Sequence, residues 1–310
     1  MIIIYILTII TIITFFVAVI SKIIRIASAP VHLRWELYPV PHEGGDKASY
    51  GGSRLEEPDW WEKKIHKDSL GELKVMVPEI VFLKGVWEHN KQLWLGSYPF
   101  HFALYLFIVN IALFSLVTFL KLIGYDILFS GNVFGQIIYY VIYIFAWTGS
   151  ILGLIGTIRL LFSRTIDPNL SKYSSASHYF NIIFIGSLYF TVFLWLISGR
   201  NFVADLSNFY YGLVTFSTAV ELPPVAYWHI ILSLLFIAYL PFTHMSHFFT
   251  KYFTYHQVRW EDEPNIPSSK LNKKLLEQLN YPVSWAAPHI GADGTKSWLA
   301  IATEIPHKEK

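Results

Sequence analysis

The chain has 310 residues, of which 54% are hydrophobic and 17% aromatic, and its formal net charge is +2. So large an apolar share excludes an ordinary soluble domain. Cysteine is absent, which excludes a disulfide, a thiolate-bound zinc ion and an iron–sulfur cluster held by this chain. Any redox centre in the chain must therefore be bound by histidine, methionine or oxygen ligands.

Five stretches are apolar and long enough to cross a bilayer as helices. No basic residue precedes the first stretch, whereas Lys22 and Arg25 follow it directly, which favours an uncleaved anchor over a signal peptide. The stretches cover residues 2–20, 100–120, 133–158, 179–197 and 225–249.

Basic residues indicate the orientation of these helices. Of the 24 lysines and arginines, 22 fall in alternate connections that share one side, and Lys121 and Arg200 fall on the other. By the positive-inside rule, we expect an all-α, multi-pass protein of the inner cell membrane, with its N-terminus outside and its C-terminus inside. The expected parts are an anchor helix (1–20), a cytoplasmic loop (21–98), a four-helix bundle (99–250) and a cytoplasmic tail (251–310).

The loop and the tail are polar, and neither has the apolar periodicity of an independent domain. Trp60, Trp61, Trp285 and Trp298 in these segments favour a surface for a partner, although tryptophans also lie against lipid headgroups. On the opposite side, the segment 199–225 is the one stretch large enough to form a lid or a docking surface.

Histidines are the candidate ligands of the bundle. His229 and His247 lie eighteen residues apart on one apolar stretch, which predicts that they share a helix face about 27 Å apart. Imidazole is costly to bury in lipid without a partner, so the pair favours a bound group, with haem iron the leading candidate.

His101 is the predicted partner of His247. It opens the second apolar stretch, with Pro99 expected near the helix start, where a missing N–H does no harm. His247 closes the fifth stretch at a similar depth, as a bis-histidine haem requires. The alternative is that both histidines are solvated at the membrane interface.

His229 has no histidine opposite it, so three roles stay open. It is a ligand with an unidentified partner, a proton acceptor in a quinol site, or a packed side chain. His178 and His244 are alternatives to the ligands chosen above, and His32 and His42 are expected to contact a partner or headgroups.

Three arginines lie near the depth expected for the inner haem. Arg34, Arg159 and Arg164 are candidate partners of its propionates. The ordinary excess of basic residues on the inner side explains them at least as well.

Three motifs resemble a known family. The segment PFTHMSHFF, with a histidine eighteen residues before its last one, resembles the gamma (cytochrome b) subunit of respiratory nitrate reductase. The segments HLRWELYP and WLGSYPFHFALYL are more similar to its relatives in heterodisulfide reductase, in the sulfite-reductase-associated complex and in the transmembrane complex of sulfate reducers that holds a multihaem cytochrome c.

The resemblance implies ligand positions. His101 and His247 match the ligands of that family's inner haem b, and His229 matches one ligand of its outer haem. The second outer ligand falls on Ile111, which cannot bind iron. We therefore expect one haem b, with two the alternative.

The expected function is electron transfer between the menaquinone or quinone pool and a cytoplasmic partner in anaerobic respiration. The resemblance implies an iron–sulfur partner of the heterodisulfide-reductase type; a multihaem cytochrome c docked on the outer side stays open, and no nucleic-acid partner is expected. Arg34, Tyr38 and His42 are candidate quinone contacts, and Glu221 and His229 are candidate proton acceptors. The alternatives are a haem-free transporter with a histidine-lined proton path and a structural anchor.

Overall fold

In the computed structural model, residues 1–28, 56–59, 62–63, 68–253, 267–285 and 290–304 are described. Within these ranges the chain is helical, apart from connecting segments and an isolated β-bridge between Pro282 and Ser297. Two compact units form: unit 1 comprises residues 1–17 and 76–243, and unit 2 comprises 18–75 and 244–310. The helices are α1 (Ile2–Ser28), α2 (Ser69–Val81), α3 (Lys84–His89), α4 (Lys91–Leu122), α5 (Val133–Ile166), α6 (Pro168–Ser171), α7 (Ala176–Ile197), α8 (Phe202–Thr215), α9 (Pro224–Tyr239), η3 (Leu240–Phe242), η4 (His244–Ser246), α10 (His247–Lys251), α12 (Lys270–Leu279) and α13 (Trp298–Thr303).

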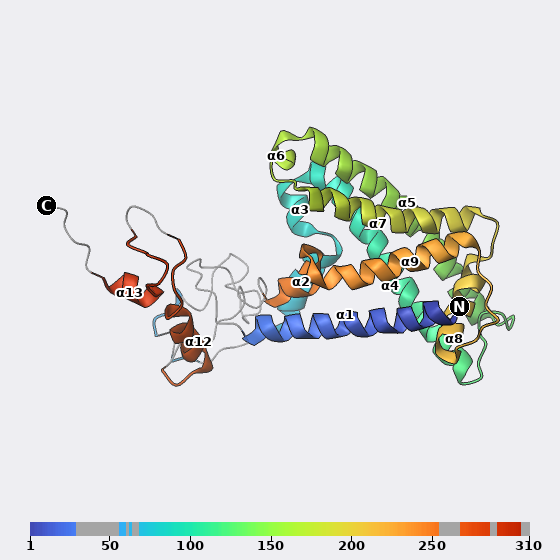
Figure 1. The fold of residues 1–310 in the computed structure, drawn as a ribbon, viewed down its shortest axis with the longest axis horizontal. Coiled ribbons are helices and arrows are strands. Elements are labelled where there is room, and N and C mark those ends of the chain that lie inside the picture. The colour runs from blue at the N-terminus through green and yellow to red at the C-terminus, as the bar shows by residue number, and fades with distance from the viewer. Residues whose placement is uncertain (29–55, 60–61, 64–67, 254–266, 286–289, 305–310) are drawn as a thin grey trace. The chain divides into compact units, whose positions relative to one another are not determined.

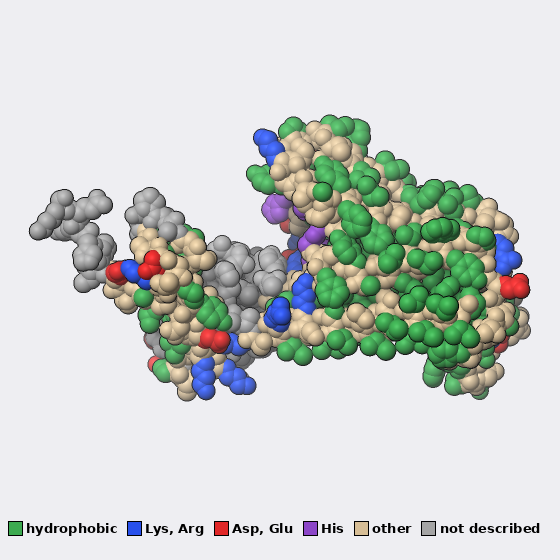
Figure 2. Space-filling model, viewed as in Figure 1, with side chains coloured by type: hydrophobic (Ala, Val, Ile, Leu, Met, Phe, Trp, Pro, Cys, Tyr) green, Lys and Arg blue, Asp and Glu red, His purple; other side chains and the backbone are tan. Residues whose placement is uncertain are grey.

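Five helices are long and apolar enough to cross a membrane, as predicted: α1, α4, α5, α7 and the segment Pro224–Phe242 that begins with α9. Several extend beyond the predicted apolar cores. α4 has 32 residues and α5 has 34, whereas about 20 span the hydrocarbon. Apolar side chains cover the visible side of these helices in Figure 2, as a lipid-facing surface requires.

The spanning helices of unit 1 pack as an antiparallel row, α4 on α5, α5 on α7 and α7 on α9 (Figure 1). Gly96 of α4 faces Arg159 of α5. The Tyr239 hydroxyl of α9 donates to Asn181 of α7 at 3.0 Å. These contacts fix the register between neighbouring helices at the end of the bundle where α4 and α7 begin and α5 ends. We call this the basic end, since it carries Lys91, Arg159, Arg164 and Lys172.

Glycines allow the close approach of α4, α5 and α7. A Cβ at Gly153 would lie 2.4 Å from the Tyr189 ring, and one at Gly156 would lie 2.6 Å from the Phe100 backbone nitrogen. Gly149 and Gly153 form a GxxxG pattern, a feature of tightly packed membrane helices. The Tyr189 hydroxyl, buried in this contact, donates to the Phe100 carbonyl at 2.7 Å.

α8 closes the opposite end of the bundle, where the N-terminus also lies (Figure 1). Asn201 caps it by accepting a hydrogen bond from the Ala204 N–H. Phe202 and Tyr210 of α8 pack against Phe114 of α4. Burial raises the pKa of Tyr210 to about 12. The segment that includes α8 therefore forms part of the core rather than a detached lid.

The first turns of α1 also join this closed end. The Tyr5 ring is fully buried beside Phe209 of α8, and its hydroxyl donates to the Ser217 carbonyl at 3.1 Å. Tyr5 and Thr8 are the buried residues of α1. Because the rest of the helix exposes isoleucine, leucine and phenylalanine, α1 is suited to a lipid environment.

Two sequence-based predictions of helix geometry were wrong. The fifth stretch is not one helix through residue 249, since α9 ends at Tyr239 and Thr243 is extended. Pro241 explains the break, because proline lacks an N–H and its ring clashes with the preceding turn. His229 and His247 therefore do not share a face of one continuous helix. Pro99 does not start its helix either, because α4 begins at Lys91.

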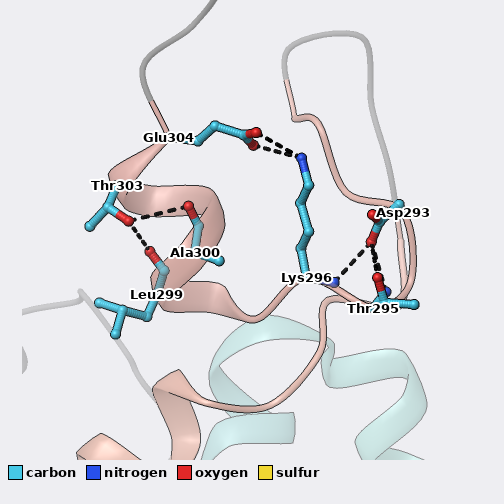
Figure 3. Close-up of polar contacts among 7 residues, drawn as sticks. All are labelled: Asp293, Thr295, Lys296, Leu299, Ala300, Thr303 and Glu304. Atoms are coloured by element: carbon cyan, nitrogen blue, oxygen red, sulfur yellow. Dashed lines mark hydrogen bonds and ion pairs between the residues drawn. The ribbon is translucent and has the colours of Figure 1, made fainter.

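Unit 2 contains a small folded module in the C-terminal part of the chain. The Val283 N–H donates to the Lys296 carbonyl at 2.9 Å, and the Trp298 N–H donates to the Tyr281 carbonyl at 3.1 Å. Beyond this pairing, Lys296 forms an ion pair with Glu304 at 2.8 Å (Figure 3). The Lys274 ammonium of α12 donates to the Ala27 carbonyl of α1 at 3.2 Å. The tail thus contains more local structure than its weak apolar periodicity indicates.

Candidate functional site

His101 lies in the third turn of α4 and is half-buried. Its Nδ1 is 2.7 Å from the Ser97 carbonyl oxygen, one helical turn earlier. Since a carbonyl only accepts, Nδ1 must carry the proton, and in the neutral ring Nε2 then carries the lone pair. Metal-bound histidines are commonly oriented in this way, with the second ring nitrogen donating to a backbone carbonyl. The tautomer of His101, with the lone pair on Nε2, therefore fits a haem ligand.

His247 has the same hydrogen-bond pattern in a different local structure. It begins α10, and its Nδ1 lies 3.2 Å from the His244 carbonyl oxygen. Nε2 is again the nitrogen that carries the lone pair in the neutral ring. His244, considered as an alternative ligand, thus contributes its backbone carbonyl to the orientation of His247.

The pairing of these two histidines stays a prediction from the sequence. His101 belongs to unit 1 and His247 to unit 2, and the structure describes each unit by itself. Among the described residues, no group of three His, Asp or Glu side chains gathers to hold a metal ion. A bis-histidine haem does not need such a group, because the porphyrin supplies the remaining ligands.

His229 has hydroxyl partners instead of a carbonyl. Its Nδ1 lies 2.9 Å from the Thr191 hydroxyl of α7, and its Nε2 lies 3.5 Å from the Ser233 hydroxyl. The Trp195 ring packs 6.2 Å away. Of the three roles proposed for His229, this geometry matches the packed side chain most closely.

The α4 position that the resemblance assigns to the second outer ligand is apolar. Ile111 is 51% exposed and has no ligating atom. Its neighbour Asn110 is buried, and its amide donates to the Ile142 carbonyl at 3.1 Å. The Asn110 side chain therefore serves the contact between α4 and α5.

His178 does not fit the role of an alternative ligand. It is the third residue of α7, and its Nδ1 accepts a hydrogen bond from the Ser175 N–H at 3.0 Å, forming a capping box. This bond uses the Nδ1 lone pair and leaves the proton on Nε2 in the neutral ring. The tautomer is the opposite of that of His101.

The remaining predicted contacts are distributed as follows. Arg34, Tyr38 and His42, with His32, fall in residues 29–55, outside the described residues. Glu221 is exposed in the connection before α9. Arg159 contacts Gln92 and Ser163, and Arg164 contacts Ser174.

Sequence reasoning missed a buried carboxylate that bonds to Trp195, the ring packed near His229. The Asp205 carboxylate of α8 accepts hydrogen bonds from the Trp195 indole at 3.2 Å and from Arg200 at 2.9 Å. Trp195 is fully buried, and Arg200 is half-exposed. The sequence did contain a signal for this contact: Arg200 lies five residues before Asp205, and Asn201 between them is a residue type that caps helices.

No protein-family model, no curated protein and no solved structure matches this chain. The resemblance to membrane cytochrome b subunits therefore rests on the sequence motifs alone.

Proposed function

We propose that this protein is a membrane cytochrome b subunit, which transfers electrons between the quinone pool and an iron–sulfur partner on the cytoplasmic side. The observation that carries the proposal is the shared orientation of His101 and His247. Each ring donates from Nδ1 to a backbone carbonyl, at 2.7 Å for His101 and 3.2 Å for His247. In the neutral ring the lone pair is therefore on Nε2. His178, which caps a helix, has the other tautomer.

In this proposal, the residues of the chain bind and orient the haem. His101 and His247 would hold the haem, and the Ser97 and His244 carbonyls fix the tautomer and orientation of their rings. Bound haem supplies a one-electron carrier. The chain has no cysteine, so the next iron–sulfur centre must belong to a partner.

Quinol oxidation also requires a site that binds the quinone ring. We propose Arg34, Tyr38 and His42 as quinone contacts near the inner haem. The packed arrangement of His229, with hydroxyls at both ring nitrogens, favours this inner site over one that depends on His229.

Alanine variants test the ligand assignment. We expect His101→Ala and His247→Ala each to remove the low-spin haem signal while the protein still inserts into the membrane. His178→Ala is the matched control and should keep the signal, because its Nδ1 serves the helix cap. Unchanged spectra in both ligand variants, or loss of the signal in the control, would contradict the assignment.

Limited proteolysis tests the cytoplasmic partner. The loop of residues 21–98 and the tail from Lys251 should be cut readily in inverted vesicles only after the partner is stripped. Trp285 and Trp298, which are partly exposed in the tail, supply aromatic contacts of the kind enriched at interfaces. Equal cleavage with and without the partner would count against this surface.

A further inference from the structure

A pocket of about 230 Å³ opens at the basic end of unit 1. It lies between the start of α4 and the end of α5, where α6 begins. Asn90 and Gln92 line one side, and Arg159, Ser163 and Asp167 line the other. The pocket thus combines one cationic, one anionic and three neutral polar side chains at the end of two spanning helices.

The Arg159 guanidinium is available to an anion because it contacts neutral atoms. It donates to the Gln92 amide oxygen at 3.1 Å and to the Ser163 hydroxyl at 2.9 Å. In the described part of the chain it makes no ion pair with a carboxylate. Its aliphatic stem packs against Gly96, where a Cβ would lie 3.0 Å from Arg159 Cγ. The stem is therefore held against α4, and the charged group remains in the pocket.

Asp167 supplies a negative charge in the same pocket lining as Arg159. The guanidinium extends along α5 as far as Ser163, and four further residues to Asp167 correspond to about 6 Å of helix rise. One Asp167 oxygen accepts the Asn169 N–H at 2.9 Å and caps α6. Along the helix axis, this rise of about 6 Å separates the cation of Arg159 from the anion of Asp167, which is of the order of the length of an ethanolamine phosphate.

Apolar side chains continue the pocket toward the lipid. Phe162 and Ile166 of α5 line it and are 57% and 60% exposed. A cationic side chain in a pocket between spanning helices can bind the phosphate of a lipid headgroup, and exposed apolar side chains next to such a pocket can contact acyl chains. A soluble ligand would not use this apolar rim.

We propose that this pocket binds a phospholipid whose headgroup carries a primary ammonium, as in phosphatidylethanolamine. The phosphodiester contacts Arg159 and Gln92, and the ammonium contacts Asp167. A primary ammonium donates hydrogen bonds to a carboxylate, whereas the trimethylammonium of phosphatidylcholine has no N–H to donate. The glycerol headgroup of phosphatidylglycerol lacks the cation.

Native mass spectrometry and thermal unfolding of the purified, detergent-solubilised full chain test the proposal. The probes are phosphatidylethanolamine, phosphatidylcholine and phosphatidylglycerol with the same acyl chains, together with inorganic phosphate. We expect wild-type protein to retain phosphatidylethanolamine about tenfold more strongly than the other two lipids, as one charge-assisted hydrogen bond allows. Inorganic phosphate should give no thermal shift.

Variants separate the two contacts. Asp167→Asn keeps a residue suited to the helix cap, and it should abolish the preference for phosphatidylethanolamine over phosphatidylcholine. Arg159→Gln should weaken binding of all three lipids about tenfold. Arg164→Gln, the matched control, removes the same charge from a residue outside the pocket lining and should behave as wild type. Equal retention of phosphatidylethanolamine and phosphatidylcholine by wild-type protein, a thermal shift with inorganic phosphate, or unaltered binding by Arg159→Gln would overturn the proposal.

Discussion

The hydrogen-bond partner of each imidazole distinguishes the histidines of this chain. Backbone carbonyls accept from His101 and His247, a backbone N–H donates to His178, and hydroxyls contact His229. Carbonyl and N–H partners impose opposite tautomers, and the Thr191 hydroxyl, which donates to the Ser187 and Leu188 carbonyls, leaves His229 Nδ1 as the donor of their contact. The candidate ligands therefore differ from His178 in a property that the sequence does not display.

Replacement of His229 tests its packed role. We expect His229→Ala to leave the haem content per chain unchanged and to lower the free energy of unfolding by about 1–3 kcal/mol, because the packed ring loses its contacts with Thr191 and Trp195. The haem content is measured by the pyridine haemochrome assay, and stability is measured by denaturant unfolding in detergent. Loss of half the haem would instead show that His229 binds a second one.

Asp293 gives a prediction about pH. Its carboxylate accepts hydrogen bonds from the Thr295 hydroxyl and from the Lys296 and Thr295 N–H groups, and these lower its pKa to about 2 (Figure 3). A lowered pKa stabilises the fold above the unfolded value of about 3.9, and that contribution is lost as the pH falls through the folded value. Hydrogen exchange of residues 290–304, corrected for intrinsic rates, should show falling protection between pH 4 and pH 2. Asp293→Ala should reduce this pH dependence and leave the part that comes from the Lys296–Glu304 ion pair.

At the scale of the elements, the close contact of α5 with α7 depends on Gly153. A methyl group there would lie 2.4 Å from the buried Tyr189 ring. Gly153→Ala should lower the free energy of unfolding by about 1–3 kcal/mol through overpacking. Gly85→Ala is the control, since nothing lies within 4 Å of its added Cβ. Thermal unfolding in detergent compares the two variants, and equal stability would contradict the packing described here.

The sequence predicted the five spanning helices because their apolar cores are long and uninterrupted. It underestimated α4, because the residues from Lys91 to Ser97, a mixture of polar and apolar side chains, continue the helix beyond the predicted apolar core. α8 was missed since it is short and mixes polar with aromatic residues, although Asn201 supplies a helix cap. The break at Pro241 was predictable from the rule on proline in helices, but the hydropathy of the surrounding residues masked it.

The sequence predicted which histidines belong to the candidate site, but not the contacts that they make. Histidines in apolar segments identified His101, His229 and His247 as candidates. The hydroxyl contact between His229 and Thr191 joins residues 38 positions apart, and no local pattern indicates it. The Asp205 contact with Trp195 depends on the chain turning back after α7 so that α8 reaches the end of that helix, which hydropathy alone does not predict.

At the scale of the whole molecule, the orientation in the membrane can be measured directly. The chain has no cysteine, so single cysteines introduced on its surface report their side without a background. Tyr173, 82% exposed between α6 and α7, lies at the basic end, and Ser130 is exposed between α4 and α5 at the other end. An impermeant maleimide on intact cells should label Ser130→Cys, and Tyr173→Cys only after permeabilisation. The reverse pattern would contradict the N-terminus-out topology.

The central claim is that this chain binds haem b. The measurement that tests it most directly is a pyridine haemochrome assay on the purified protein, combined with quantitative amino-acid analysis. We predict one haem b per chain, since His101 and His247 have the hydrogen-bond pattern of ligands and Ile111 cannot complete an outer pair. The absence of haem from correctly inserted protein, with no Soret band, would contradict the account and favour a haem-free transporter or anchor.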